Sequence, residues 1–186
     1  MKKHSMIVLM LTLLTLCGCT SVYQATYGVA VDERNVSTIA SDKKITLSIQ
    51  EKFLQDDAIK VLDISPFCYN GHVYLVGEYG TEKERGRALE IANQTPGVNS
   101  VTPYLLRKKE KDSCGTTDNL GISAKVSAKL IADKDVWSTN VDLKVVQCNV
   151  VLLGIVGSKK EIDKAIADAR SVTGVRGVTS YLKATK

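Results

Sequence analysis

Apolar residues recur along this chain with two different periods, which predict an alternation of helices and strands. Ile45, Ile49 and Phe53 stand four positions apart and place one apolar stripe on a helix. Asp42 precedes them and is a residue type that caps helix N-termini, so we expect the helix to begin there. Partial alternation over residues 61–68 then predicts a strand.

The following segment predicts a hairpin. Asn70-Gly71 is the dipeptide favoured in tight hairpin turns, and residues 73–79 form the expected returning strand. Gly77 lies inside that strand, where a glycine suggests a bulge or a close approach of another backbone.

A second helix and a last strand complete the unit. Thr81 and Glu84 have the spacing of a capping box, and Ala88 and Ala92 supply small residues for a side packed closely on a sheet. Pro-Gly at 96–97 ends the helix, and a strand is expected over the residues after it, 98–106.

The same order of elements returns 77 residues further on. With the chain shifted by 77 residues against itself, 18 of the 68 positions from Asp42 to Lys109 are identical, without a gap. A repeat of this length, present twice, indicates a duplicated small domain. In the second copy we expect helices at 118–133 and 158–172 and strands at 138–146, 149–156 and 175–183.

Each copy is therefore an αββαβ unit, an α+β fold in which two helices cover one face of a three-stranded sheet. A unit of roughly 70 residues is marginal for an independent core. We therefore expect the two copies to pack on each other.

The first residues belong to neither copy. Lys2 and Lys3 precede an apolar run over 6–16. At about 11 residues the run is too short to span a bilayer, which takes roughly 20. It therefore predicts a secretory signal over residues 1–18.

Leu16-Cys17-Gly18-Cys19 resembles the lipobox of bacterial lipoproteins, which implies that Cys19 carries the lipid anchor. Thr20 rather than Asp after the cysteine implies sorting to the outer membrane, with the protein in the periplasm. Residues 19–41 lack sustained periodicity and would form the tether. The alternative is an ordinary signal peptide with chance cysteines.

Charge and chemistry narrow the function classes. Without the two lysines of the expected signal, 23 basic residues stand against 20 acidic ones, a formal net charge of about +3. This small excess does not support nucleic-acid binding, but it suffices for weak attraction to an anionic lipid surface. Beyond the signal the only histidine is His72, in a predicted turn, and no nucleotide-loop, zinc or nucleophile motif occurs. We therefore expect no catalysis, metal, cofactor or small-molecule substrate. Cys68, Cys114 and Cys148 allow one disulfide with one thiol left over, and their spacing leaves the pairing open.

One set of motifs occurs in the same order in both copies: a helix, a hairpin with V-x-L-x-G, a helix with A-x-x-x-A and a strand with G-V-x-x-V. This set resembles the BON domain, with domain 1 at 42–111 and domain 2 at 112–186. Two BON domains behind a lipobox resemble outer-membrane lipoproteins of this family. The resemblance implies binding of anionic phospholipid by the first helix of domain 2, and a role in envelope integrity.

That helix has features suited to lipid. Leu120 and Ile131 project within about 20° of each other, away from the expected core stripe, and give the helix a second apolar edge. Lys125 and Lys129 stand one turn apart nearby. Apolar residues that insert and lysines that meet phosphates are typical of interfacial helices.

Several alternatives stay open. The family's helix opens with a tryptophan where this chain has Gly121, and the only tryptophan, Trp137, lies past the helix end. Trp137 is either an interfacial anchor or a cap on the core. Ile131 could instead cover the other domain, as Leu54 at the equivalent position suggests. The rival function is a protein-interaction module that docks other envelope proteins and binds no lipid beyond the anchor.

Overall fold

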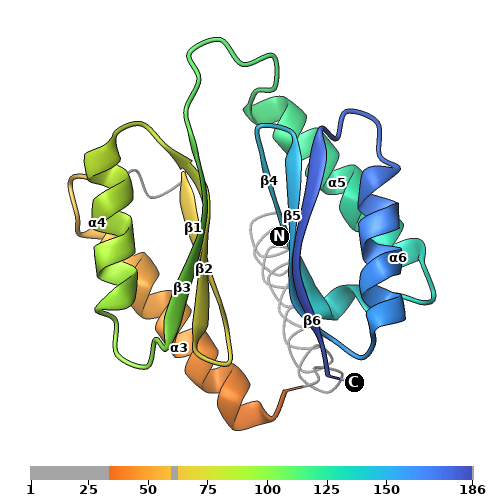
Figure 1. Cartoon of the computed structure of the whole chain (residues 1–186), viewed down its shortest axis with the longest axis horizontal. Helices are drawn as coiled ribbons and strands as arrows, with labels where there is room; N and C mark the ends of the chain where they lie inside the picture. Colours follow the sequence, from red (N-terminus) through yellow and green to blue (C-terminus); the bar gives the residue numbers. More distant parts are fainter. Residues whose placement is uncertain (1–33, 60–62, 186) are drawn as a thin grey trace, which may run out of the picture.

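The computed structural model describes residues 34–59 and 63–185. The expected signal peptide, Cys19 and the tether up to residue 33 lie outside the described residues. The described chain forms two αββαβ units, each with a three-stranded sheet, as predicted (Figure 1). The first unit comprises α3 (Val36–Leu54), β1 (Ile64–Tyr69), β2 (His72–Tyr79), α4 (Glu82–Asn93) and β3 (Ser100–Arg107).

The second unit repeats the first with one addition, the short 3-10 helix η1. Its elements are α5 (Thr116–Ala132), η1 (Ser138–Asn140), β4 (Val141–Val146), β5 (Asn149–Val156), α6 (Lys159–Arg170) and β6 (Gly177–Ala184). In both sheets the hairpin strands pair antiparallel, and the strand after the second helix joins the middle strand in parallel. The second helix of each unit is thus the crossover of a parallel strand pair.

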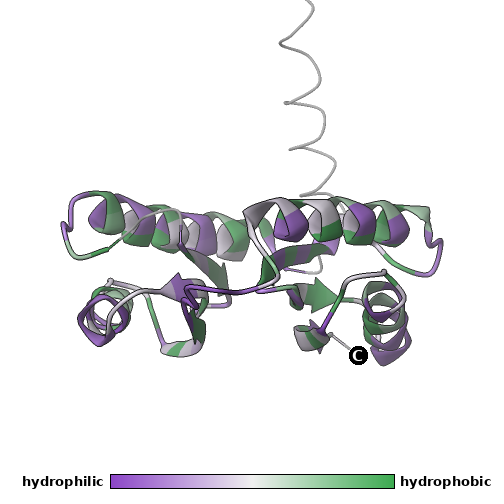
Figure 2. Ribbon diagram, turned by 90° about the horizontal axis from the view of Figure 1, so that it is seen from above, coloured by the Kyte–Doolittle hydropathy of each residue, from purple (hydrophilic) through white to green (hydrophobic). Residues whose placement is uncertain are grey.

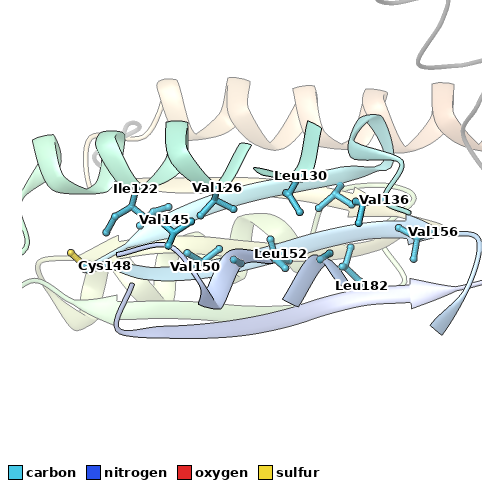
Figure 3. Packing of buried hydrophobic residues seen from close by; sticks show 14 of the residues in the cluster. Ile122, Val126, Leu130, Val136, Val145, Cys148, Val150, Leu152, Val156 and Leu182 are labelled. Atoms are coloured by element: carbon cyan, nitrogen blue, oxygen red, sulfur yellow. The ribbon is translucent and has the colours of Figure 1, made fainter. Parts of the chain in front are cut away.

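A separate core lies between the helices and the sheet of each domain. In domain 2 the α5 stripe of Ile122, Val126 and Leu130 is buried, as expected, against Val150 and Leu152 of β5 (Figure 3). The domain 1 core is built in the same way around Ile45, Ile49 and Phe53 of α3. The helical period of the sequence predicted both stripes correctly.

The outer faces of the two sheets pack against each other. A third apolar cluster joins Tyr74 and Val76 of β2 to Val151 and Leu153 of β5. In Figure 1 the two sheets lie side by side in the middle of the molecule, with the helices of each domain on the far side of its own sheet. The expectation that the two copies pack on each other is confirmed.

The helices are not equivalent in their placement. Seen from above, α3 and α5 run along one side of the molecule, whereas α4 and α6 are viewed nearly end-on towards the opposite side (Figure 2). The first helices of both domains therefore share one face of the molecule.

The predicted start of the first helix was wrong. The helix begins at Val36, so the last part of the expected tether is helical, and Asn35 is the cap, accepting the Thr38 N–H at 2.8 Å. Asp42 is instead buried, and its carboxylate accepts the backbone N–H groups of Asn70 and Gly71, each at 2.8 Å. The residue satisfies backbone donors as expected of its type, but those donors belong to the hairpin turn.

Other boundaries shift by a few residues. Helix α5 begins at Thr116, after Gly115 rather than at 118. The strand expected from residue 138 begins at Val141, because η1 occupies the three residues before it. Thr81 accepts the N–H group of Glu84, as their spacing predicted, and Ser158 accepts that of Glu161 at the equivalent place in domain 2.

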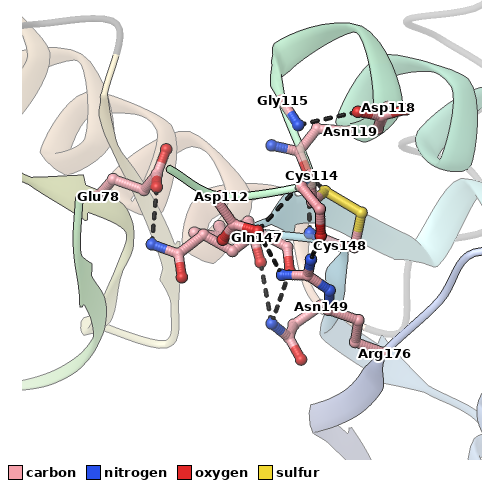
Figure 4. The surroundings of a disulfide bond; sticks show 12 residues. Glu78, Asp112, Cys114, Gly115, Asp118, Asn119, Gln147, Cys148, Asn149 and Arg176 are labelled. Carbon is pink, nitrogen blue, oxygen red and sulfur yellow. Dashed lines mark hydrogen bonds and ion pairs between the residues drawn. A yellow bond between two sulfur atoms is a disulfide. The ribbon is translucent and has the colours of Figure 1, made fainter. Parts of the chain in front are cut away.

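A disulfide joins Cys114 to Cys148, with the Cα atoms 5.8 Å apart (Figure 4). It fastens the segment before α5 to the hairpin turn of domain 2. Arg176 adds to this junction, since its guanidinium pairs with Asp112 at 2.7 Å and donates to Ser113 Oγ at 2.6 Å. Cys68 is the leftover thiol, and its burial raises the pKa to about 12.

Candidate functional site

Helix α5 has one buried side and one exposed side, and the exposed side is apolar at its edge. Leu120 is 67% exposed and Ile131 is 72% exposed. Ile131 therefore does not cover the other domain, which was the alternative interpretation of this residue. The two side chains project in nearly the same direction, because eleven residues correspond to about three full turns.

Small residues fill the exposed side between the apolar edge and the far flank. Gly121, Ala124 and Ala128 are all exposed, and no acidic residue occurs from Leu120 to Ala132. The sequence contains this signal, since the small residues and the lack of acidic residues over 120–132 are visible without the structure, but alanines do not by themselves indicate a binding surface. From Leu120 to its C-terminal end, the exposed face of α5 consequently lacks the negative charge that would repel an anionic surface; the one exposed acidic residue of the helix, Asp118, lies in its first turn.

Rotation along the helix separates the lysines from the apolar edge. Lys125 and Lys129 are rotated by about 140° to 180° from Leu120 around the helix axis. Lys125 lines a hollow next to Gly174. Lys129 lies towards Asp168 of α6, whose pKa is raised by burial and by Asp133, and the charge of Lys129 offsets a small part of that rise. The lysines thus form the flank of α5 towards α6, with the alanines between them and the apolar edge.

Leu120 lies on the opposite flank, next to domain 1. It lines a cleft of about 360 Å³ between the two domains, together with Glu78 of β2 and Leu143 of β4. The sequence could not place this flank, because it depends on how the two sheets pack.

Trp137 follows the end of α5 and is 53% exposed. Its backbone N–H donates to Glu161 Oε1 at 2.8 Å, which fixes the main chain at this point. The preceding residue, Val136, is the one that enters the core. Trp137 therefore presents about half of its surface to solvent at the same end of α5 as Ile131.

Domain 1 repeats this surface only in part, because Leu54 at the position equivalent to Ile131 is exposed but other positions differ. At the positions equivalent to Leu120, Gly121 and Ala128, α3 carries Lys43, Lys44 and Glu51, all exposed. The two first helices have the same buried stripe, but their exposed faces differ in charge. The divergence lies at the residues that contribute least to the fold.

Within residues 34–59 and 63–185, no helix combines the length and apolar character needed to cross a bilayer. The same residues contain no group of three or more His, Cys, Asp or Glu side chains arranged to hold a metal ion. His72 pairs through Nδ1 with Ser100 Oγ and through Nε2 with Thr102 Oγ1, both at 2.8 Å. Both ring nitrogens of His72 are therefore occupied by hydroxyl groups of the neighbouring strand, β3.

In a comparison with known protein families, this chain matches the BON domain at residues 41–106 and again at 118–186. The chain belongs to the BON-domain family. The two matches coincide with the two αββαβ units described above, so the duplication is one of whole BON domains.

Two relatives carry informative names. The chain is 29% identical over 150 residues to the osmotically-inducible protein Y of Escherichia coli, covering 80% of this chain and 75% of that protein. It is 27% identical over 158 residues to the outer membrane lipoprotein DolP of Haemophilus influenzae, covering 83% and 80% of the two chains.

Among solved structures, the C-terminal domain of CdsD, a structural protein of the type III secretion system of Chlamydia trachomatis, aligns over 78% of this chain and 67% of its own. The identity is 11% and the TM-score 0.32, so the likeness is too slight to support an argument.

Proposed function

We propose that this BON-domain protein is anchored by acylated Cys19 in the outer membrane, faces the periplasm and binds anionic phospholipid through α5, supporting envelope integrity. The observation that carries the proposal is the exposed face of α5, which combines Leu120 and Ile131 with two lysines and no acidic residue from 120 to 132. The name of the DolP relative, an outer membrane lipoprotein, supports the location. The proposal includes no catalytic step.

The expected affinity is modest. Burying one Leu or Ile side chain in an apolar phase contributes roughly 1.5–3 kcal/mol. A well-placed lysine contributes about 1 kcal/mol near an anionic surface. Because Leu120 and Ile131 are already partly covered, the sum is on the order of 4–6 kcal/mol, which alone corresponds to binding weaker than micromolar. The anchor at Cys19 would raise the effective concentration at the membrane.

The test measures binding of the chain from residue 20 onward, which keeps every residue of both domains, to vesicles of phosphatidylglycerol and of phosphatidylcholine. Trp137 is the only tryptophan, so its fluorescence reports directly on the end of α5. We expect binding to the anionic vesicles only, weakening as salt is added.

Two variants of α5 locate the site. Ile131→Glu should reduce the affinity about tenfold or more, because an apolar contact is replaced by a charge that the lipid repels. Lys125→Gln with Lys129→Gln should weaken binding and flatten its salt dependence. The matched controls are Ala167→Glu and Arg170→Gln on α6, both at exposed positions on the other side of the molecule.

If both α5 variants bind like the controls, the assignment to α5 is wrong. If the wild-type chain binds neither kind of vesicle, the protein-interaction module becomes the better function.

A further inference from the structure

Helix α3 carries an exposed apolar line of its own. Val36 is 66% exposed, Leu47 is 51% exposed and Leu54 is 69% exposed. Their spacings of 11 and 7 residues bring all three within about 20° of one another around the helix. More than half of each side chain is therefore open to solvent.

The exposed large apolar side chains of the described residues all occur on α3, on α5 or just after α5. They are Val36, Leu47, Leu54, Leu120, Ile131 and Trp137. Helices α4 and α6 contribute none of them. Because α3 and α5 run along the same side of the molecule in Figure 2, this exposed apolar surface is confined to one face.

The charges on that face favour an anionic partner. At the exposed positions of α3 and α5, the lysines outnumber the acidic residues: Lys43, Lys44, Lys125 and Lys129 stand against Glu51 and Asp118. Lys43 lies one turn before Leu47, so a cation stands next to the apolar line. Apolar side chains flanked by lysines on helices lying in one plane suit a lipid surface.

The anchor also favours a membrane as the occupant. Val36 follows Cys19 by 17 residues, so a fully extended chain at about 3.3–3.6 Å per residue keeps the first turn of α3 within roughly 60 Å of an acylated Cys19. The tether would therefore connect the anchor to the domains through α3, one of the two helices of this face.

We propose that α3 is a second membrane contact, and that α3 and α5 dock side by side on one anionic lipid surface. This inference rests on the proposed function and extends it from domain 2 to both domains. The molecule would lie with its α3–α5 face on the bilayer and with α4 and α6 turned away.

The experiment places a single tryptophan on chosen helices of the chain from residue 20 onward. Trp137→Phe removes the only native indole, and Leu47→Trp or Ala167→Trp then introduces one on α3 or α6. Phosphatidylglycerol vesicles with brominated acyl chains quench indoles that enter the bilayer. We expect quenching with Leu47→Trp, as with the native Trp137, and none with Ala167→Trp.

An affinity measurement accompanies the quenching. Leu47→Glu with Leu54→Glu should lower the affinity for phosphatidylglycerol vesicles about tenfold or more, as Ile131→Glu does. Ala167→Glu should leave it unchanged. Circular dichroism of each variant checks that the fold is retained.

The outcomes separate the two proposals. If Trp137 is quenched and Ile131→Glu weakens binding, but the α3 variants show neither effect, α5 remains the lipid site and the two-helix docking is overturned. If sedimentation without vesicles shows a dimer that Leu47→Glu dissociates, the α3 line is a contact between two copies and the inference also falls.

Discussion

Single glycines explain how the middle strand of each sheet fits its neighbours. Gly154 in β5 has a φ of +144°, and a Cβ built there would stand 2.0 Å from the carbonyl oxygen of Asn140. Gly77 occupies the equivalent place in β2, with the oxygen of Asp63 at 1.9 Å. The close backbone approach that Gly77 suggested in the sequence is confirmed at both positions.

We predict that Gly154→Ala lowers the free energy of unfolding by about 3 kcal/mol or more, because it combines a strained φ with a clash against backbone. Gly86→Ala in α4 is the control, since a Cβ there meets nothing within 4 Å. That control should raise the free energy of unfolding by up to about 1 kcal/mol, through helix propensity alone. Urea unfolding curves give both free energies. If Gly154→Ala and Gly86→Ala changed the free energy of unfolding equally, the close backbone approach at Gly154 would be contradicted.

At the scale of elements, each hairpin turn is tied to the first helix of its own domain, but by different residues. Domain 1 uses Asn70-Gly71, whose N–H groups bond to Asp42 of α3. Domain 2 uses Gln147-Cys148, both with positive φ, and joins the turn to the start of α5 by the disulfide. In domain 2 Asn119 stands at the position equivalent to Asp42, and its Oδ1 accepts the Cys148 N–H at 2.9 Å. The disulfide adds a covalent bond at the same junction, next to the helix whose outer face we assign to lipid.

We predict that reducing the Cys114–Cys148 disulfide destabilises the protein by about 2–4 kcal/mol, as expected for a loop closed over 34 residues. The measurement is unfolding in urea with and without reductant. Cys114→Ser with Cys148→Ser should unfold like the reduced protein and should ignore the reductant.

The leftover thiol provides a second readout of the same experiment. Cys68 is buried next to Asp42 and its pKa is about 12, so it should resist thiol reagents until the chain unfolds. Rapid labelling of more than this one cysteine in the unreduced, unfolded chain from residue 20 onward would show that the disulfide is absent.

At the scale of the whole molecule, the two sheets bring groups of different domains together. The His72 ring stacks on Tyr74, with centroids 4.4 Å apart, and Tyr74 lies against Tyr181 of β6 at 4.9 Å. Burial lowers the pKa of His72, and the charge of Lys183 from the other domain lowers it further. This histidine therefore reports on the packing of the domains.

We predict a His72 pKa below its usual value of 6.5, rising when Lys183→Ala removes the charge across the interface. His72 is the only histidine in the chain from residue 20 onward, so proton NMR follows it without ambiguity. Because its folded-state pKa is lowered, His72 favours the folded state fully above pH 6.5, and this contribution declines as the pH falls below that value. A pKa unchanged by Lys183→Ala would contradict the domain packing.

The sequence alone determined the order of elements, the duplication and the core stripes of α3 and α5. These features depend on periods of two and of about 3.6 residues, which adjacent positions encode directly. The shared direction of Leu120 and Ile131 also followed from helix rotation alone.

Only the tertiary structure decided what depends on distant contacts. These features are the pairing of Cys114 with Cys148, the role of Asp42 in a turn 28 residues away, and the surroundings of the two flanks of α5. They follow from how helices meet sheets and how the sheets meet each other. The exposure of Leu47 and Ile131 to solvent also depends on the tertiary structure. An apolar residue on the outer side of a helix is buried or exposed according to what packs over it, and in this fold the domains join through their sheets, leaving both first helices uncovered.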